Sequence, residues 1–187
     1  MVEARRVHPL NIANAFTMLR VALVPLFAWL LVFREPAAPV LASIVFAFAA
    51  ATDAVDGWLA RRLQLVSGFG QFLDPLADKI LVGTALVPLA ADGRLPRWAV
   101  VVILVRELLV GVVLRAVLAR RSTALPASRI GKVKTITQIA AVFLLTAMDR
   151  GDPLALATLY VAVALTIASG VLYFSDAFRG RAGVPWA

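Results

Sequence analysis

Four aspartates within 26 residues are the strongest chemical signal in this sequence. Asp53 and Asp56 lie three residues apart in DAVDGWLAR. Asp74 and Asp78 lie four residues apart in GQFLDPLADKI. Either spacing places both carboxylates of a pair on one face of a helix. Carboxylate oxygens suit Mg²⁺ or Mn²⁺, and four of them can hold two ions about 3.5 to 4 Å apart. The pattern therefore predicts a site for two divalent cations.

The composition indicates whether this site lies in a soluble protein or in a membrane protein. Of the 187 residues, 61% are hydrophobic and only 16% are charged, with a mean hydropathy of +0.89. These values are far from those of soluble domains, so we predict an integral membrane protein with a single domain, residues 1–187. The chain has no cysteine, which excludes disulfides and thiol chemistry. Its net charge of +8 is expected at loops that face anionic lipid, and we expect no nucleic-acid partner.

The hydrophobic segments predict an all-α bundle of six transmembrane helices behind a short N-terminal juxtamembrane segment. Backbone groups in lipid must be satisfied internally, and the sequence has no strand-like alternation. The expected spans are residues 12–33, 39–62, 70–91, 98–118, 132–148 and 154–174.

The distribution of lysine and arginine predicts the orientation of this bundle. With six spans, both termini share one side of the membrane, and four basic residues fall on the other side: Arg34, Arg94, Arg97 and Arg150. The side of the termini receives twelve: Arg5, Arg6, Arg61, Arg62, Arg115, Arg120, Arg121, Arg129, Lys132, Lys134, Arg179 and Arg181. Because positive residues collect on the cytoplasmic side, we expect both termini and the aspartates to face the cytosol.

The second and third spans should present their acidic ends to one another. They are consecutive and joined by a short loop, so they are expected to be antiparallel neighbours. Carboxylates at membrane depth repel one another and lose hydration, which requires a cation between them. Gly57 and Ala60 lie close to the face of Asp53 and leave room for a ligand, while the guanidinium of Arg61 suits a phosphate.

These residues resemble a known signature, DxxDGxxAR followed after eight residues by GxxxDxxxD. It is matched here at Asp53, Asp56, Gly57, Ala60, Arg61, Gly70, Asp74 and Asp78. The signature is that of the CDP-alcohol phosphatidyltransferases, and eight matched positions make it specific. NIANAFTMLR, VRELLVGVVLR and GKVKTITQ are similar to the phosphatidylglycerophosphate synthase branch of that family, although Ala13 stands where that branch has proline.

The resemblance implies a reaction and roles for the matched residues. A phosphatidyl group would pass from CDP-diacylglycerol to glycerol 3-phosphate or another phosphorylated alcohol, releasing CMP. Asp53, Asp56, Asp74 and Asp78 would hold two Mg²⁺ or Mn²⁺ ions, and Asp78 would also accept the proton of the acceptor hydroxyl. Contacts to the CDP-lipid are implied for Asn14, Thr17, Arg20, Gly57, Ala60, Arg61, Ser67 and Gly70. A homodimer in the bacterial cytoplasmic membrane, surrounded by lipid, is also implied.

The acceptor phosphate should be bound by cations on the fourth and fifth spans. The candidates are Arg106, Arg115, Lys132 and Lys134. Arg106 is the best placed, because an arginine inside an apolar segment rarely faces lipid. Arg106 could equally form a structural pair with Glu107 or with another helix.

Alternative functions of two classes remain open at this point. A cardiolipin synthase or a phosphatidylinositol phosphate synthase would use the same donor, since the residues of the signature recognise the donor and not the acceptor. A cation transporter would also carry aspartates inside the membrane. Transport is the weaker hypothesis, because an ion path needs polar groups at several depths of the membrane. Here the acidic residues cluster at the cytosolic end of the bundle, and the fifth and sixth spans carry few polar groups.

Overall fold

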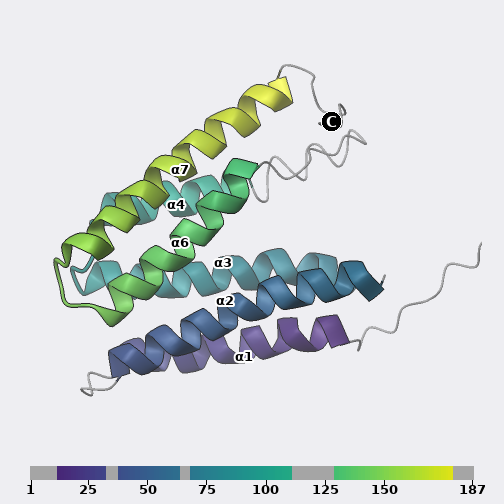
Figure 1. Cartoon of the computed structure of the whole chain (residues 1–187), viewed down its shortest axis with the longest axis horizontal. Helices are drawn as coiled ribbons and strands as arrows, with labels where there is room; N and C mark the ends of the chain where they lie inside the picture. The colour runs from purple at the N-terminus through teal and green to yellow at the C-terminus, as the bar shows by residue number, and fades with distance from the viewer. Residues whose placement is uncertain (1–11, 33–37, 64–67, 111–128, 179–187) are drawn as a thin grey trace, which may run out of the picture. The chain divides into compact units, whose positions relative to one another are not determined.

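A computed structural model of the chain describes residues 12–32, 38–63, 68–110 and 129–178, and every segment longer than a turn within them is helical (Figure 1). The helices are α1 (Ile12–Val32), α2 (Ala38–Leu63), α3 (Gly68–Ala91), α4 (Arg97–Leu108), α6 (Arg129–Ala147) and α7 (Pro153–Phe178). The all-α prediction is confirmed for these ranges. Helical geometry continues from α4 through Val110, while the part of the expected fourth span at 111–118 lies outside the described residues.

Three of the described helices have the length and apolar composition of membrane spans. They contain the segments Ala15–Val32, Ile130–Ala147 and Pro153–Ser175. α2 and α3 contain shorter apolar segments, Ala38–Thr52 and Lys79–Ala91. Each stops short because the acidic residues occupy the other half of its helix. These features are those of a membrane protein, and the count of six spans stays a prediction.

The chain divides into two compact units, Met1–Pro88 and Leu89–Ala187. In the first unit, α1 and α2 run antiparallel and pack side by side (Figure 1). The rings of Phe27 and Phe46 meet across this interface with centroids 5.4 Å apart. Ala42 and Ala49 are fully buried on either side of Phe46 in α2. Such small residues let helix backbones approach closely where lipid supplies no hydrophobic driving force.

The acidic halves of α2 and α3 lie at the same end of the first unit. Figure 1 shows the C-terminal end of α2 and the N-terminal end of α3 together. Leu63 and Gly68 bound these ends and are separated by five peptide steps, which can span at most about 18 Å. The expected antiparallel arrangement of the second and third spans is therefore confirmed.

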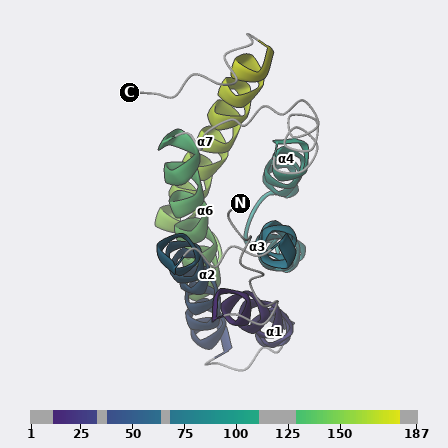
Figure 2. The ribbon, with the colours of Figure 1, turned by 90° about the vertical axis from the view of Figure 1, so that its right-hand side faces the viewer.

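In the second unit, α6 packs along α7 (Figure 2). α4 also contacts α7. One end of this unit is closed by turns with defined caps. The carboxylate of Asp152 accepts hydrogen bonds from the backbone N–H groups of Leu154 and Ala155 at 2.9 and 3.0 Å, and Pro153 begins α7. This is a standard N-terminal cap followed by proline at the first helical position. At this end Trp98 of α4 stacks on Tyr160 of α7, with centroids 6.2 Å apart.

Candidate active site

The positions of Asp53 and Asp56 continue a buried stripe of α2. Ala42, Phe46 and Ala49 are buried at alternating steps of four and three residues. The next two steps of this pattern are Asp53 and Asp56. Residues at this spacing share one face of a helix. The two aspartate positions therefore lie on the face of α2 that packs against α1, although their side chains lie outside the described part of the structure.

The positions of Asp74 and Asp78 bear the same relation to a buried stripe of α3. Ala77, Leu81 and Ala85 are buried at steps of four residues, with exposures of 1%, 2% and 0%. Asp74 precedes Ala77 by three residues, and Asp78 precedes Leu81 by three. Both aspartates thus belong to the interior face of α3 by position. Their side chains also lie outside the described part, so metal binding by the four aspartates stays a prediction.

A buried arginine occupies the same level of the first unit. The contact between Phe27 and Phe46 sets the register of the antiparallel pair α1 and α2. Arg20 lies seven residues before Phe27, and Asp53 lies seven residues after Phe46. Seven residues are about two helical turns, so the backbone positions of Arg20 and Asp53 lie level with one another along the two helices. Arg20 is fully buried, and a guanidinium at that depth marks a polar interior.

The residues expected to contact the CDP-lipid are described only in part. Thr17 and Arg20 are both buried, at 2% and 0% exposure, and share one face of α1. Six further members of that set lie outside the described side chains: Asn14, Gly57, Ala60, Arg61, Ser67 and Gly70. Binding of the donor by this set stays a prediction.

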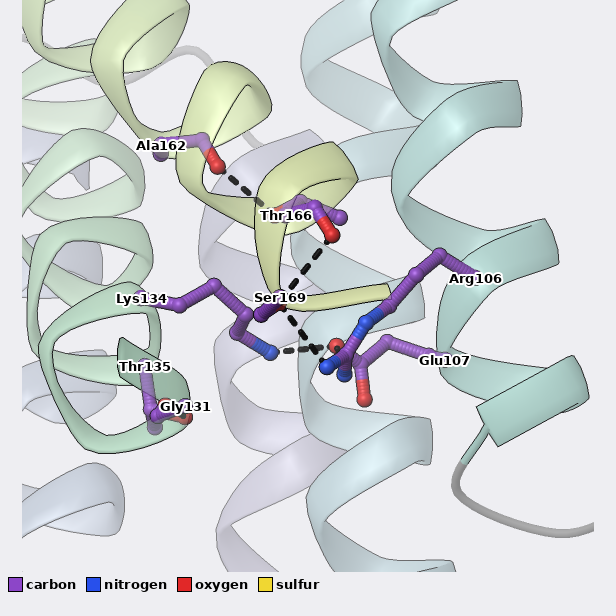
Figure 3. A network of polar contacts seen from close by, with 8 residues as sticks. All are labelled: Arg106, Glu107, Gly131, Lys134, Thr135, Ala162, Thr166 and Ser169. Carbon is purple, nitrogen blue, oxygen red and sulfur yellow. Dashed lines mark hydrogen bonds and ion pairs between the residues drawn. The ribbon is translucent and has the colours of Figure 1, made fainter. Parts of the chain in front are cut away.

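A second polar cluster joins the three helices of the second unit, as Figure 3 shows. Arg106 and Glu107 extend from α4 toward Lys134 of α6 and Ser169 of α7. The Arg106 Nη1 group donates to Glu107 Oε1 at 3.2 Å, and Lys134 Nζ donates to the same carboxylate oxygen. The Arg106 Nη2 group donates to Ser169 Oγ at 2.9 Å. Two of the four acceptor candidates are therefore held together by one carboxylate.

The α7 side of this cluster is built from hydroxyl groups. Ser169 Oγ accepts from Arg106 and donates to the backbone oxygen of Thr166 at 3.0 Å. Thr166 Oγ1 donates in turn to the backbone oxygen of Ala162 at 2.6 Å. Ser169 was not among the predicted site residues. The signal available in the sequence was the pair Thr166 and Ser169, three residues apart in an otherwise apolar span.

The other two acceptor candidates are not part of this cluster as described. Lys132 is exposed, whereas Lys134 is buried at 5% exposure. Residues two apart on a helix point in directions about 160° apart, so burial of one leaves the other on the opposite side. Arg115 lies outside the described residues.

Polar side chains on α6 and α7 are more numerous than the sequence led us to expect. Gln138, Thr146, Thr166 and Ser169 are all buried. Thr146 donates to the backbone oxygen of Val142 at 2.7 Å, so its hydroxyl is satisfied within its own helix, as that of Thr166 is. The expectation of few polar groups in these spans was wrong, so the polarity of α6 and α7 does not weigh against transport.

Comparison with known proteins decides the family. The model of the family described as CDP-alcohol phosphatidyltransferase matches residues 10–168, which is most of the chain. The chain belongs to the CDP-alcohol phosphatidyltransferase family. It is 42% identical to a probable phosphatidylglycerophosphate synthase of Mycobacterium tuberculosis, over 97% of this chain and 88% of that protein. It is 40% identical to the CDP-diacylglycerol--glycerol-3-phosphate 3-phosphatidyltransferase of Bacillus subtilis, over 88% of this chain and 94% of that protein.

Membership of the CDP-alcohol phosphatidyltransferase family makes this chain an enzyme, a phosphatidyltransferase. The resemblance drawn from the aspartate signature is confirmed. The transporter alternative is answered by the same finding, since the match covers α1 to α4, α6 and most of α7. The chain is also 35% identical to the CDP-diacylglycerol--glycerol-3-phosphate 3-phosphatidyltransferase of Rickettsia bellii, over 88% of this chain and 93% of that protein.

Proposed function

We propose that this phosphatidyltransferase transfers the phosphatidyl group of CDP-diacylglycerol to glycerol 3-phosphate, forming phosphatidylglycerophosphate and CMP. The observation that carries the proposal is the full aspartate signature in a chain that is 40% identical to a relative named for this reaction. The cationic cluster of Arg106 and Lys134 supports a phosphorylated acceptor.

The acidic positions suit a pair of divalent cations. Four carboxylates on the interior faces of α2 and α3 would carry four negative charges at one end of the unit. Such a cluster is unstable without cations, and oxygen-only ligands favour Mg²⁺ or Mn²⁺. Asp53, Asp56, Asp74 and Asp78 would hold two ions, which supply charge stabilisation for phosphoryl transfer.

The residues of the chain would then bind, orient and deprotonate the substrates. Thr17 and Arg20, with the glycine-containing face of α2, would hold the CDP portion of the donor. Asp78 would take the proton of the acceptor hydroxyl, a role carried by the family resemblance. The freed oxygen attacks the phosphorus that bears diacylglycerol, and the bond from that phosphorus to the CMP oxygen breaks with its electron pair.

The acceptor phosphate would lie against the cations of the second unit. Arg106 and Lys134 are nearly buried, with side-chain exposures of 16% and 6%. Charge-assisted hydrogen bonds to phosphate are strongest in such dry surroundings. Arg115 would complete a basic approach from the cytosol.

The membrane arrangement belongs to the same proposal. Six spans would place both termini, the aspartates and the cationic cluster on the cytosolic side of a bacterial cytoplasmic membrane. The donor would enter from the bilayer and the acceptor from the cytosol. The enzyme would act as a homodimer.

The decisive experiment is an acceptor panel with the purified enzyme. With Mg²⁺ or Mn²⁺ and CDP-diacylglycerol, CMP should be released when glycerol 3-phosphate is added. Release with phosphatidylglycerol or inositol phosphate instead would move the assignment to cardiolipin or phosphatidylinositol phosphate synthesis.

Matched variants test the metal site within this assay. Asp74→Asn removes a proposed ligand and should abolish CMP release, as should EDTA. Asp152→Asn changes a helix cap at a distance in sequence and should retain it. Activity of Asp74→Asn equal to that of the unchanged enzyme would contradict the proposed site.

A further inference from the structure

One carboxylate oxygen in the second unit is shared by two cations. Arg106 Nη1 and Lys134 Nζ both donate to Glu107 Oε1. These are the two described cations that the proposed function assigns to the acceptor phosphate. Arg106, Lys134 and Glu107 carry a formal net charge of +1, so the carboxylate already neutralises half of the positive charge of these two cations. A phosphate that binds there must compete with Glu107 for the same donors.

The surroundings make this competition strong. The side chains of Arg106, Glu107 and Lys134 are 16%, 12% and 6% exposed. Charges interact far more strongly at such sites than in bulk water, and an unpaired buried charge is costly. The two cations therefore need an anion at all times. Glu107 fills that role when no acceptor is bound.

The Nε–H group of Arg106 is a donor that an incoming anion can use. Its Nη1 and Nη2 groups are engaged by Glu107 and Ser169, while its Nε group is buried with no hydrogen-bond acceptor in the described part of the chain. A buried donor of this kind is destabilising until an acceptor reaches it. When a phosphate displaces the carboxylate from Nη1 and from Lys134, one of its oxygens can also accept from this Nε group.

We propose that Glu107 is a specificity-determining residue that admits phosphate monoesters and rejects phosphodiesters as ligands of the acceptor pocket. This inference rests on the proposed function. A monoester has a second pKa of about 6 and carries about two negative charges above neutral pH. A diester carries one charge, the same as Glu107. The carboxylate is tethered beside the cations and loses no translational freedom on binding, so it outcompetes an equal charge from solution.

The consequence is a choice between acceptors. Glycerol 3-phosphate is a monoester dianion and displaces Glu107. Phosphatidylglycerol is a diester monoanion and does not. The carboxylate thus excludes the phosphodiester acceptor that a cardiolipin synthase would use.

Two small phosphates test this inference with the purified enzyme at pH 8. Methyl phosphate is a dianion there and dimethyl phosphate is a monoanion. In the unchanged enzyme, methyl phosphate should inhibit CMP release competitively with glycerol 3-phosphate, and dimethyl phosphate should inhibit at least about tenfold more weakly. Equal inhibition by both compounds would overturn the proposal.

Glu107→Gln then removes the charge and keeps the shape and a carbonyl acceptor. The inhibition constant of dimethyl phosphate should fall about tenfold, which brings the two compounds close together. Glu107→Asp keeps the charge and should keep the preference for the monoester. A structural ion pair alone would change the melting temperature of Glu107→Gln and leave the preference intact, which would refute the proposal.

Asp92 supplies a matched control in the same unit. Its carboxylate also accepts from two arginines, Arg94 and Arg150. Asp92→Asn therefore removes an equal charge from a similar pair, and the preference for methyl phosphate should persist. A loss of preference in Asp92→Asn as large as in Glu107→Gln would overturn the proposal.

Two further arms separate the possible failures. If the unchanged enzyme releases no CMP with glycerol 3-phosphate, the proposed function fails, and the shift in melting temperature caused by each phosphate still measures the preference.

If Glu107→Gln does not fold, the double variant Glu107→Gln/Lys134→Gln removes the pair together. It should bind both phosphates weakly and without preference, and a preference equal to that of the unchanged enzyme would contradict the inference.

Discussion

Two arginine clusters in the second unit contain similar residues but differ in the groups that accept hydrogen bonds from the arginine. Arg94 donates from Nε to Asp92 Oδ2 at 3.1 Å and from Nη1 to the backbone oxygens of Leu145 and Met148 at 3.1 and 2.6 Å. Arg106 donates to side chains, those of Glu107 and Ser169. Each arginine shares its carboxylate with a second cation.

The difference lies in what accepts the hydrogen bonds. The carbonyl groups bound by Arg94 belong to the end of α6 and the turn after it, where backbone oxygens have no helical partner. Those acceptors are held by the main chain, so the cluster acts as a cap. The acceptors of Arg106 can rotate away, and its Nε group still lacks one among the described residues. An arginine with replaceable partners can exchange them for a ligand, and one bound to main-chain carbonyls stabilises the fold.

Among the variants that compare the two clusters, Arg106→Ala has the largest expected effect, which is on activity. The substitution removes charge-assisted hydrogen bonds worth about 1.5 to 3 kcal/mol each. We expect kcat/KM for glycerol 3-phosphate to fall about 100-fold, mainly through KM, in the CMP-release assay. The KM for CDP-diacylglycerol should change little. A fall confined to thermal stability would remove the distinction between the clusters.

The next effect is that of Arg94→Ala on stability. This change leaves two carbonyl groups, one in the last turn of α6 and one in the turn after it, without their donor and should cost about 2 to 3 kcal/mol. Thermal unfolding in detergent should shift downward by several degrees. The KM for glycerol 3-phosphate should stay within about twofold, since no substrate contact is lost. A larger change in KM would assign Arg94 to the acceptor site as well.

The smallest effect is that of Ser169→Ala. It removes the acceptor of Arg106 Nη2 and should raise the KM for glycerol 3-phosphate about three- to tenfold. Ser175→Ala on the same helix is the control, because Ser175 Oγ donates only to the backbone oxygen of Leu172 in the contacts described, at 2.8 Å. Steady-state kinetics of the two variants should therefore differ. Equal KM values would show that the hydroxyl of Ser169 does not position Arg106.

The helices were the predictable part of the fold. The span expected at residues 12–33 is observed as Ile12–Val32, and the one expected at 39–62 as Ala38–Leu63. Long apolar runs in lipid have no alternative to internal hydrogen bonding, so their extent follows from composition. The expected start of the fifth span at residue 132 was three residues late, because Arg129 at the observed start of α6 is polar and hydropathy does not register it.

Part of the candidate site was predictable for a similar reason. Helical periodicity alone places Asp53 with Asp56 and Asp74 with Asp78, and the structure adds that these positions continue buried stripes. The acceptor side was less predictable. Lys132 and Lys134 have the same residue type and nearly the same position in the sequence, and only packing against α7 makes one buried and the other exposed.

The sequence by itself determined the membrane setting, the extent of the helices and the spacing of the four aspartates, because these depend on composition and on the geometry of a single helix. The tertiary structure decided which helix faces meet. It brought Arg106 and Glu107 of α4, which lie 28 and 27 residues before Lys134 in the chain, to Lys134 of α6, and it added Ser169 of α7. Contacts between helices depend on the rotation and register of each one, and local periodicity cannot specify either.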